Sequence, residues 1–328
     1  MESDNLKKFK ILIVIIVLVI IHLVNTDNNI QENQEIEVEV SQVEVREEFY
    51  YDKYYDLKIG DSLDDMISKV GKPDRIDTSE YGFSWYVYNK DLTKFNMVGI
   101  KDKKIVGFFS NSLDSCEASG ITLLQNKEDV ESLYKPIEFK LKNFVKYIVD
   151  SKGEYDIIDV DNKYITLFYD IHDNNKITSY LIIDKAQERE LKGIYSQGND
   201  QLKKSYELQT IDLINSERIK NNLEILTQSE NAQKSSQNHS QDMMVNNFFN
   251  HINLNNKDPF DRMKSENIEY KIAGENIAAG QTNAIYAHEA LMNSLGHRNN
   301  ILGNYKYIGV GISFGGTYGI YYTQNFYK

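Results

Sequence analysis

Four of the six histidines in this 328-residue chain fall in or just before one stretch, residues 247–303. They are His239, His251, His288 and His297. The same stretch contains Glu275, in a Gly-Glu-Asn triplet that apolar residues and glycine follow. Ionisable side chains are mostly exposed in folded proteins, whereas these stand beside apolar positions and turn residues. The pattern therefore indicates a polar site inside a fold, whose groups can bind a cation or transfer a proton.

Helices and a terminal hairpin are predicted to position these groups. Apolar residues at helical spacing and suitable capping residues predict four helices: residues 205–222, residues 230–245, a short helix opened by Asp258-Pro259, and AIYAHEALMNS, which ends at Gly296. The chain then ends in YIGVGISF, two glycines and YGIYYTQNF, which predict a β-hairpin. Helices flanking a small antiparallel sheet predict a three-layer α/β/α sandwich over residues 203–328.

A separate domain is predicted over residues 51–200, and it repeats one unit of a helix and three strands. The first copy is DSLDDMISKVGKP (61–73) with strand-like runs at 83–89, 96–102 and 104–110. The second copy is NKEDVESLYKP (126–136) with runs at 163–170, 177–184 and 191–196. The fold class is therefore α+β, with a duplicated helix-plus-antiparallel-sheet domain before the sandwich. Three polar residues of this domain are expected in solvated turns: Asp77, Glu80 and His172.

The N-terminus has the pattern of an export segment. Residues 11–24 are apolar and follow three lysines, which is typical of a signal peptide or an uncleaved signal anchor over residues 1–26. Residues 27–50 are acidic and polar, and we interpret them as a flexible linker. Because the positive charge precedes the apolar run, the remaining chain is expected outside the cytoplasm, on the extracellular face of the membrane or secreted.

The net charge argues against a nucleic-acid-binding protein, and the cysteine content excludes an intrachain disulfide. A net charge of -12 opposes nucleic-acid binding, which needs a basic face to neutralise phosphates. The only cysteine is Cys116, so an intrachain disulfide cannot form.

Two resemblances to known families follow from longer motifs. FFNH, PFDRM, AGENIAAGQ, ALMNSLGHRNNIL, YIGVGISF and YYTQNF occur in the order found in the bacterial branch of the CAP superfamily (cysteine-rich secretory proteins, antigen 5, pathogenesis-related 1; SCP-like). Residues 58–196 resemble the CAP-associated N-terminal domain, through IGDSLDDMISKVGKP, FSWYVYN and GIKDKKIVGFFS. That second family has no established chemistry, so its resemblance implies architecture alone.

The CAP resemblance implies a central cavity lined by two histidines and two acids. It places the first histidine at His251, the first acid at Glu275 and the second histidine at His297. The second acid is replaced by Ser294, and the usual tryptophan before it is replaced by Leu291. The sequence thus departs from the family pattern in the part of the cavity that would complete its charge.

The chemistry of this set leaves three alternatives open. The cavity of His251, Glu275, Ser294 and His297 could bind a ligand. His251, Glu275 and His297 could also bind Zn²⁺ or a similar cation, with water completing the shell, although the missing acid would weaken the site. Glu275 and His297 could instead act as acid and base on water. In the third alternative, Glu275 and His297 only stabilise the fold, with Glu275 bonded to backbone amides and His297 supporting the last helix. Of the remaining groups, His239 is expected in the core and His288 at the rim, and Glu289 would supply the missing acid if its helix turned it inward.

Two functions are therefore compared. The first is an exported, membrane-tethered CAP protein that binds an envelope ligand or protein partner without catalysis. The second is a metal-dependent hydrolase acting on peptide or cell-wall material. Lipid binding is a third idea that rests on the resemblance alone.

Overall fold

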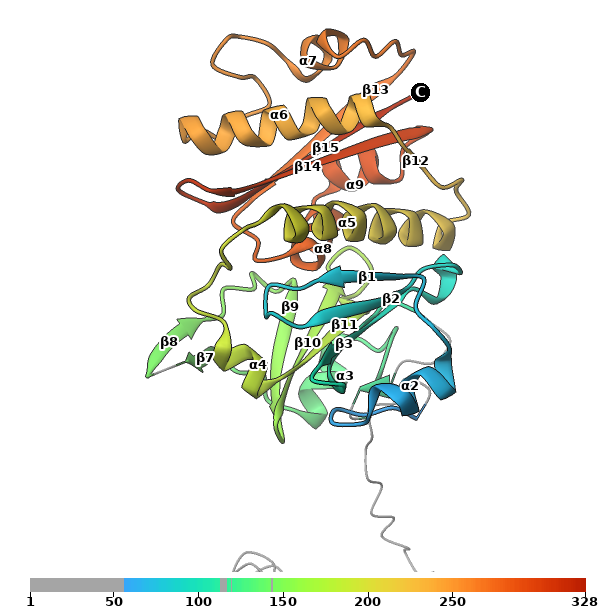
Figure 1. Ribbon diagram of the computed structural model, residues 1–328, viewed down its shortest axis with the longest axis vertical. Coiled ribbons are helices and arrows are strands. Elements are labelled where there is room, and N and C mark those ends of the chain that lie inside the picture. Colours follow the sequence, from blue (N-terminus) through green and yellow to red (C-terminus); the bar gives the residue numbers. More distant parts are fainter. Residues whose placement is uncertain (1–55, 113–116, 119, 143) are drawn as a thin grey trace, which may run out of the picture. The chain divides into compact units, whose positions relative to one another are not determined.

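The structure is a computed structural model that describes residues 56–112, 117–118, 120–142 and 144–328. The predicted export segment (1–26), the predicted linker (27–50) and Cys116 lie outside the described residues. Within the described ranges, no helix combines the length and the apolar composition that crossing a bilayer requires. The described residues belong to one compact unit, in which the two larger β-sheets are separated by helices (Figure 1).

The first half of this unit is built on a seven-stranded antiparallel sheet. Its strands, in spatial order, are β1 (Arg75–Thr78), β2 (Ser84–Tyr88), β3 (Asn96–Lys101), β4 (Lys104–Ser110), β11 (Lys176–Asp184), β10 (Lys163–Asp170) and β9 (Tyr155–Val160). The meanders β2–β3–β4 and β9–β10–β11 meet where β4 pairs with β11. Helix α2 (Leu63–Val70) precedes the first meander and α3 (Lys127–Leu133) precedes the second.

The prediction of a strand at residues 191–196 is wrong, because these residues form no strand in the structure. The third strand of the second meander is instead β9, which lies before β10 in the chain. Strand β11 is already paired on both sides, with β4 and β10, so no edge is left beside it. The chain leaves the sheet there because the Asp184 side chain caps helix α4 (Lys185–Glu190) by accepting from the Ala186 amide.

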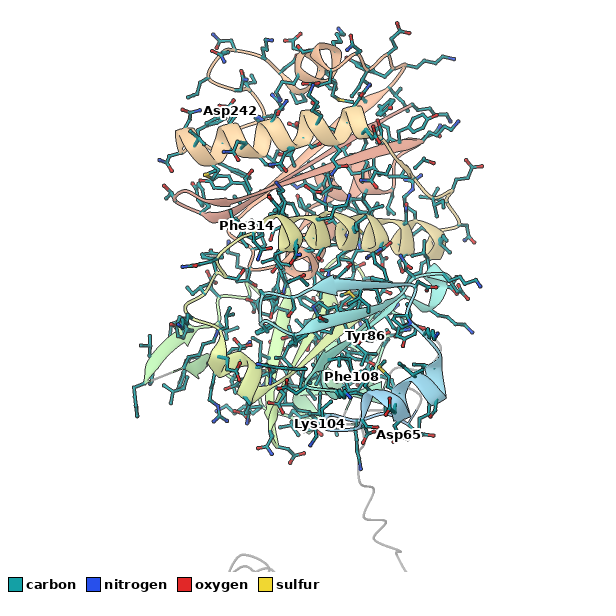
Figure 2. The ribbon with its side chains drawn as sticks, in the orientation of Figure 1. Asp65, Tyr86, Lys104, Phe108, Asp242 and Phe314 are labelled. Carbon is teal, nitrogen blue, oxygen red and sulfur yellow. The ribbon has the colours of Figure 1, made fainter. Side chains whose placement is uncertain are left out.

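Both faces of this sheet are covered. One face packs with α2 and α3 through apolar residues such as Met66, Val130 and Phe108. The other face contributes Trp85 and Phe168 to a core shared with the second half of the chain. In strand β4 every residue after Lys104 is buried, as expected of a strand covered on both faces. Phe108 lies inside the core, and Lys104 lies at the exposed start of the strand (Figure 2).

The second half is built on a four-stranded sheet. Its order is β12 (Thr227–Gln228), β14 (Tyr307–Gly315), β15 (Gly319–Tyr327) and β13 (Ala273–Ala279). Its helices are α5 (Asp200–Lys220), α6 (Glu230–Asn246), α7 (Pro259–Ser265), α8 (Ala284–Met292) and α9 (Leu295–Ile301). Two short hairpin sheets, β5–β6 (Glu117–Ala118 and Ile121–Thr122) and β7–β8 (Phe139–Lys142 and Val145–Ile148), belong to the first half.

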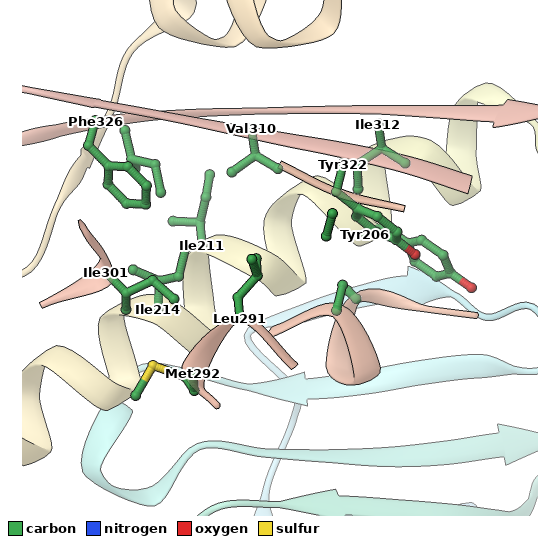
Figure 3. Close-up of a cluster of buried hydrophobic side chains, with 14 of the residues drawn as sticks. Tyr206, Ile211, Ile214, Leu291, Met292, Ile301, Val310, Ile312, Tyr322 and Phe326 are labelled. Carbon is green, nitrogen blue, oxygen red and sulfur yellow. The ribbon is translucent and has the colours of Figure 1, made fainter. Parts of the chain in front are cut away.

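Alternation along β14 places different side chains on the two faces of this sheet. Val310 and Ile312 join the core formed with α5 and α8 (Figure 3). Gly309 and Gly311 face α6, where a Cβ would lie 2.0–2.1 Å from that helix's backbone. The Ser236 hydroxyl of α6 donates to the Gly309 carbonyl at 2.9 Å. Glycine is therefore required for the close approach of α6 to the sheet.

The helix predicted to run from AIYAHEALMNS to Gly296 is two helices. Helix α8 ends at Met292, and α9 begins at Leu295, which is exposed rather than part of an apolar face. The break lies at Asn293, whose side chain bonds the carbonyl of Tyr169 (2.8 Å) and the amide of Ile171 (3.1 Å). Contacts with the first half of the chain thus end the helix one turn early.

Polar contacts join the two halves. Arg75 pairs with Asp77 and with Asp212 of α5, at 2.7 Å and 2.6 Å. Asn283 donates to Glu80 at 2.6 Å. The prediction that Asp77 and Glu80 lie in solvated turns is wrong for Asp77, which is 4% exposed, and Glu80 is only partly exposed. Charged residues that look like turn residues in the sequence are interface residues here.

Candidate functional site

Glu275 is the centre of the polar group predicted from the sequence. It lies on β13, where it is paired in register with Asn325, and its side chain is 1% exposed. One carboxylate oxygen lies 2.9 Å from His251 Nδ1. The other accepts from Arg262 Nη2 at 2.6 Å. Both oxygens of this buried acid are therefore engaged by side chains of the protein.

Arg262 is the residue that sequence reasoning missed. It lies on α7, whose start is fixed by a capping box between Asp258 and Asp261. Besides Glu275, it donates to the carbonyls of His251 (2.7 Å) and Lys257 (2.9 Å). It thus binds the loop before α7 to strand β13. A buried carboxylate that is charged is usually paired with a cation, and this tendency was the available indication that the arginine in PFDRM had this role.

The Nδ1 atom of His251 faces Glu275, and its Nε2 atom points away from that carboxylate. Because Nδ1 faces a carboxylate, a neutral ring carries its proton on Nδ1 and a lone pair on Nε2. Among the described residues, Nε2 has no hydrogen-bond partner, and the side chain is 45% exposed. Glu275 therefore orients His251 so that a hydrogen-bond acceptor faces the surface.

His297 and Ser294 form a second pair on α9. His297 Nδ1 lies 2.8 Å from the Ser294 hydroxyl. Ser294 is the N-cap residue of α9, yet its side chain makes no capping hydrogen bond. Burial lowers the pKa of His297, and nearby His251 lowers it further, so the ring is neutral at pH 7. We call His251, Arg262, Glu275, Ser294 and His297 together the polar site.

Amide side chains hold the two parts of the polar site together. Asn276 on β13 donates to the His297 carbonyl at 3.1 Å. Asn300 on α9 donates to the Glu275 carbonyl (3.2 Å) and to the Asn276 side-chain oxygen (2.9 Å). Helix α9 is therefore fixed against β13 by hydrogen bonds rather than by apolar packing alone.

The site residues do not fit a metal ion as they stand. The described part of the chain contains no group of three or more His, Cys, Asp or Glu side chains that could hold one. A cation beside Glu275 would meet the Arg262 guanidinium, which already occupies one oxygen at 2.6 Å. Zn²⁺ binding by His251, Glu275 and His297 stays a prediction, and the Arg262 guanidinium would oppose it by charge repulsion.

The three other candidates lie elsewhere. His239 is buried on α6, with Nε2 3.0 Å from the Asn250 carbonyl, and burial lowers its pKa to about 4. His288 is 1% exposed, so its predicted place at a rim is wrong. Glu289 accepts from the hydroxyls of Ser179 (2.5 Å) and Thr178 (3.0 Å) in the first half of the chain. It therefore does not replace the missing acid.

The first half of the chain also holds the segment that carries Ser294 and His297. His172 Nε2 lies 2.9 Å from the Asn293 carbonyl, although we expected this histidine to be solvated only. Asp170 forms an ion pair with Arg298. The β10–β11 turn thus contacts residues on both sides of the Ser294–His297 pair. Such contacts between distant segments have no local sequence pattern.

Family models match both halves of the chain. Residues 59–195 match the CAP-associated N-terminal family, and residues 211–326 match the cysteine-rich secretory protein family. The uncharacterized membrane protein YlbC of Bacillus subtilis is 26% identical over 290 residues, which cover 82% of each chain. The uncharacterized protein YkwD of the same organism is 45% identical over 123 residues, covering 37% of this chain and 47% of YkwD.

Two solved structures have the same fold. An extracellular SCP-domain protein from Bacillus anthracis matches with a TM-score of 0.73 and 24% identity, over 92% of this chain and all of that one. A cysteine-rich secretory protein from Staphylococcus aureus matches with a TM-score of 0.65 and 18% identity, over 82% of this chain and 93% of that one. The chain therefore carries a CAP-associated N-terminal domain over residues 59–195 and, after it, a CAP domain over residues 211–326, and it has the fold of the bacterial SCP-domain structures.

Proposed function

We propose that this chain is an extracellular, membrane-tethered CAP protein whose polar site binds an envelope ligand or protein partner and catalyses no reaction. The location is supported by the lysines before the apolar run at 11–24, and by relatives named as a membrane protein and an extracellular protein. Mass spectrometry of the mature N-terminus and protease treatment of intact cells test it. A chain protected from external protease would contradict the extracellular assignment.

The observation that carries the binding role is the double engagement of Glu275. Its oxygens contact His251 at 2.9 Å and Arg262 at 2.6 Å, and the side chain is 1% exposed, so the carboxylate is poorly placed to meet and deprotonate a water molecule. The carboxylate instead orients His251, whose Nε2 faces outward. With the hydroxyl of Ser294 and the neutral ring of His297, this nitrogen offers a ligand a partly exposed set of hydrogen-bonding groups.

Retention of the full chain on isolated cell-envelope fragments tests the binding role. The double substitution His251→Ala, His297→Ala is expected to reduce the retained amount at least tenfold. Asn255→Ala, which changes an exposed side chain in the same loop, is the matched control and should leave retention unchanged. Equal retention of the double variant and the wild type would exclude the polar site as the binding surface.

The alternative, a metal-dependent hydrolase, is favoured by one observation: His251 and His297 are neighbouring imidazoles, and His297 is neutral at pH 7. Calorimetric titration with Zn²⁺ tests the cation site, and equal heats from the wild type and the double histidine variant would remove it. Incubating the purified protein with casein and with peptidoglycan, and measuring the products released, tests catalysis. Turnover that Glu275→Gln abolishes would replace the binding role with the enzymatic one.

A further inference from the structure

A second site lies between the two domains and shares no residue with the polar site. An open cavity of about 310 Å³ lies between the β7–β8 hairpin with the residues that follow it, on one side, and residues 280–290 on the other. This volume is near the lower limit of ordinary ligand pockets, which measure ~300–1,000 Å³. The cavity is therefore large enough for a small ligand or one side chain of a partner.

Aromatic rings form one wall of the cavity. Tyr155, Phe168 and Tyr286 contact one another, with ring centroids 5.0–5.8 Å apart. Tyr155 and Phe168 come from the first domain and Tyr286 from the CAP domain. The faces of aromatic rings carry negative electrostatic potential and attract organic cations.

Acidic groups outnumber lysines in the lining by two. The acids are Glu80, Asp150, Glu154, Glu188 and Glu289, and the lysines are Lys140, Lys142 and Lys152. Lys140 and Lys142 both pair with Glu188, at 2.9 Å and 2.6 Å. Those two ammonium groups are therefore already engaged by one carboxylate of the wall.

Glu80 and Glu289 have only neutral partners. Glu80 accepts from the Asn283 amide at 2.6 Å, and Glu289 accepts from Ser179 and Thr178. Among the described residues, neither acid has an ion-pair partner. Burial raises the pKa of Glu80, and it raises the pKa of Glu289 to about 7. A cation in the cavity would stabilise the charged form of each carboxyl group, which burial alone disfavours.

Gln281 adds an acceptor without a partner. The residue lines the cavity, and its side-chain oxygen is buried and has no hydrogen-bond donor in the described residues. Buried polar atoms in native proteins are nearly always paired. A donor supplied from the cavity would satisfy this atom.

We propose that the interdomain cavity binds an alkylammonium group, carried either by a small amine or by a lysyl side chain of a peptide. The ammonium donates to Glu80 and to the Gln281 oxygen and lies against the faces of Tyr155 and Tyr286. The alkyl chain contacts Ile148 and Ile194, which line the cavity and are 73% and 51% exposed. This site does not depend on the function proposed for the polar site.

Calorimetry on the full chain in mild detergent tests the proposal with n-butylammonium chloride, and with 1-butanol as the neutral match. Acetyl-Ala-Lys-Ala-amide and its norleucine analogue form the peptide pair. We expect both cations to bind and both neutral matches to bind at least tenfold more weakly. Tighter binding of the lysyl peptide than of butylammonium assigns the site to a peptide, and equal binding assigns it to a free amine.

Two variants separate recognition from folding. Glu80→Gln keeps an acceptor for Asn283 but removes the charge, and Gln281→Leu removes an acceptor that has no partner within the described protein. Each is expected to raise the Kd for butylammonium at least tenfold, whereas Asp64→Asn on exposed α2 leaves it unchanged. The proposal is overturned if butanol binds as well as butylammonium, or if folded Gln281→Leu protein retains the wild-type Kd.

Discussion

Glu275 and Glu289 are both buried acids within the histidine-rich stretch 247–303, and they have opposite kinds of partner. Glu275 has a guanidinium at 2.6 Å and an imidazole at 2.9 Å. Glu289 has two hydroxyl partners and no cation among the described residues. The first acid organises a set of hydrogen-bonding groups near the surface. The second is held between the domains with its pKa raised by burial to about 7. Both acids are buried, and they differ in their partners: a guanidinium faces Glu275, and neutral hydroxyls face Glu289.

The largest expected effect comes from taking the cation away from Glu275. Arg262→Met leaves a buried carboxylate without its counter-charge, and the free energy of unfolding at pH 7 should fall by about 3–5 kcal/mol. Urea denaturation measures it. The double variant Arg262→Met, Glu275→Gln should recover much of the loss, because no charge then remains unpaired. A loss below about 1 kcal/mol in the single variant would show that the pair is not stabilising.

The opposite result is expected at Glu289. Its raised pKa contributes stability that is fully present below the unfolded value of 4.5 and is lost as the pH rises through about 7. Glu289→Gln should therefore be more stable than the wild type at pH 8, by about 3 kcal/mol at most, and equally stable below pH 4.5. Denaturation at both values measures the difference. Destabilisation of the variant at pH 8 would contradict the contrast with Glu275.

A smaller effect is expected where the first domain supports the polar site. His172→Ala removes a hydrogen bond to the Asn293 carbonyl and should cost about 1 kcal/mol. Amide hydrogen exchange should become faster in α9, around His297, because that segment loses a contact with the β10–β11 turn. Asp173→Ala is the matched control, since it breaks an exposed ion pair with Lys176 in the same turn. Equal exchange in the two variants would show that the turn does not support α9.

Local patterns predicted the elements well where one segment decides the outcome. Strands β4 and β10 have the predicted bounds, 104–110 and 163–170, because their apolar runs are flanked by turn residues. The error at 191–196 has a different origin. That run resembles a strand, but no open edge of the sheet lies beside β11. Strand formation depends on a partner, so a pattern in one segment cannot decide it.

The same limit applies to the candidate site. The resemblance led to His251, Glu275, Ser294 and His297, and the structure brings them together in two hydrogen-bonded pairs. Whether they bind a metal or a ligand stays a prediction. Arg262 was not expected in the site, although it makes the closest contact with Glu275. Glu289 was considered for the site and lies instead against β11.

The family resemblance, and not residue spacing, supplied the site histidines. The sequence by itself determined most of the elements of the two domains and the glycines that face α6. These features follow from local spacing, capping and residue size, which each segment carries in its own residues. Only the tertiary structure decided which charge each buried acid meets. Arg262 reaches Glu275 across 13 residues, and Ser179 reaches Glu289 across 110. Such pairs depend on how helices and sheets pack, because a hydrogen bond forms only where packing places donor and acceptor within about 3 Å.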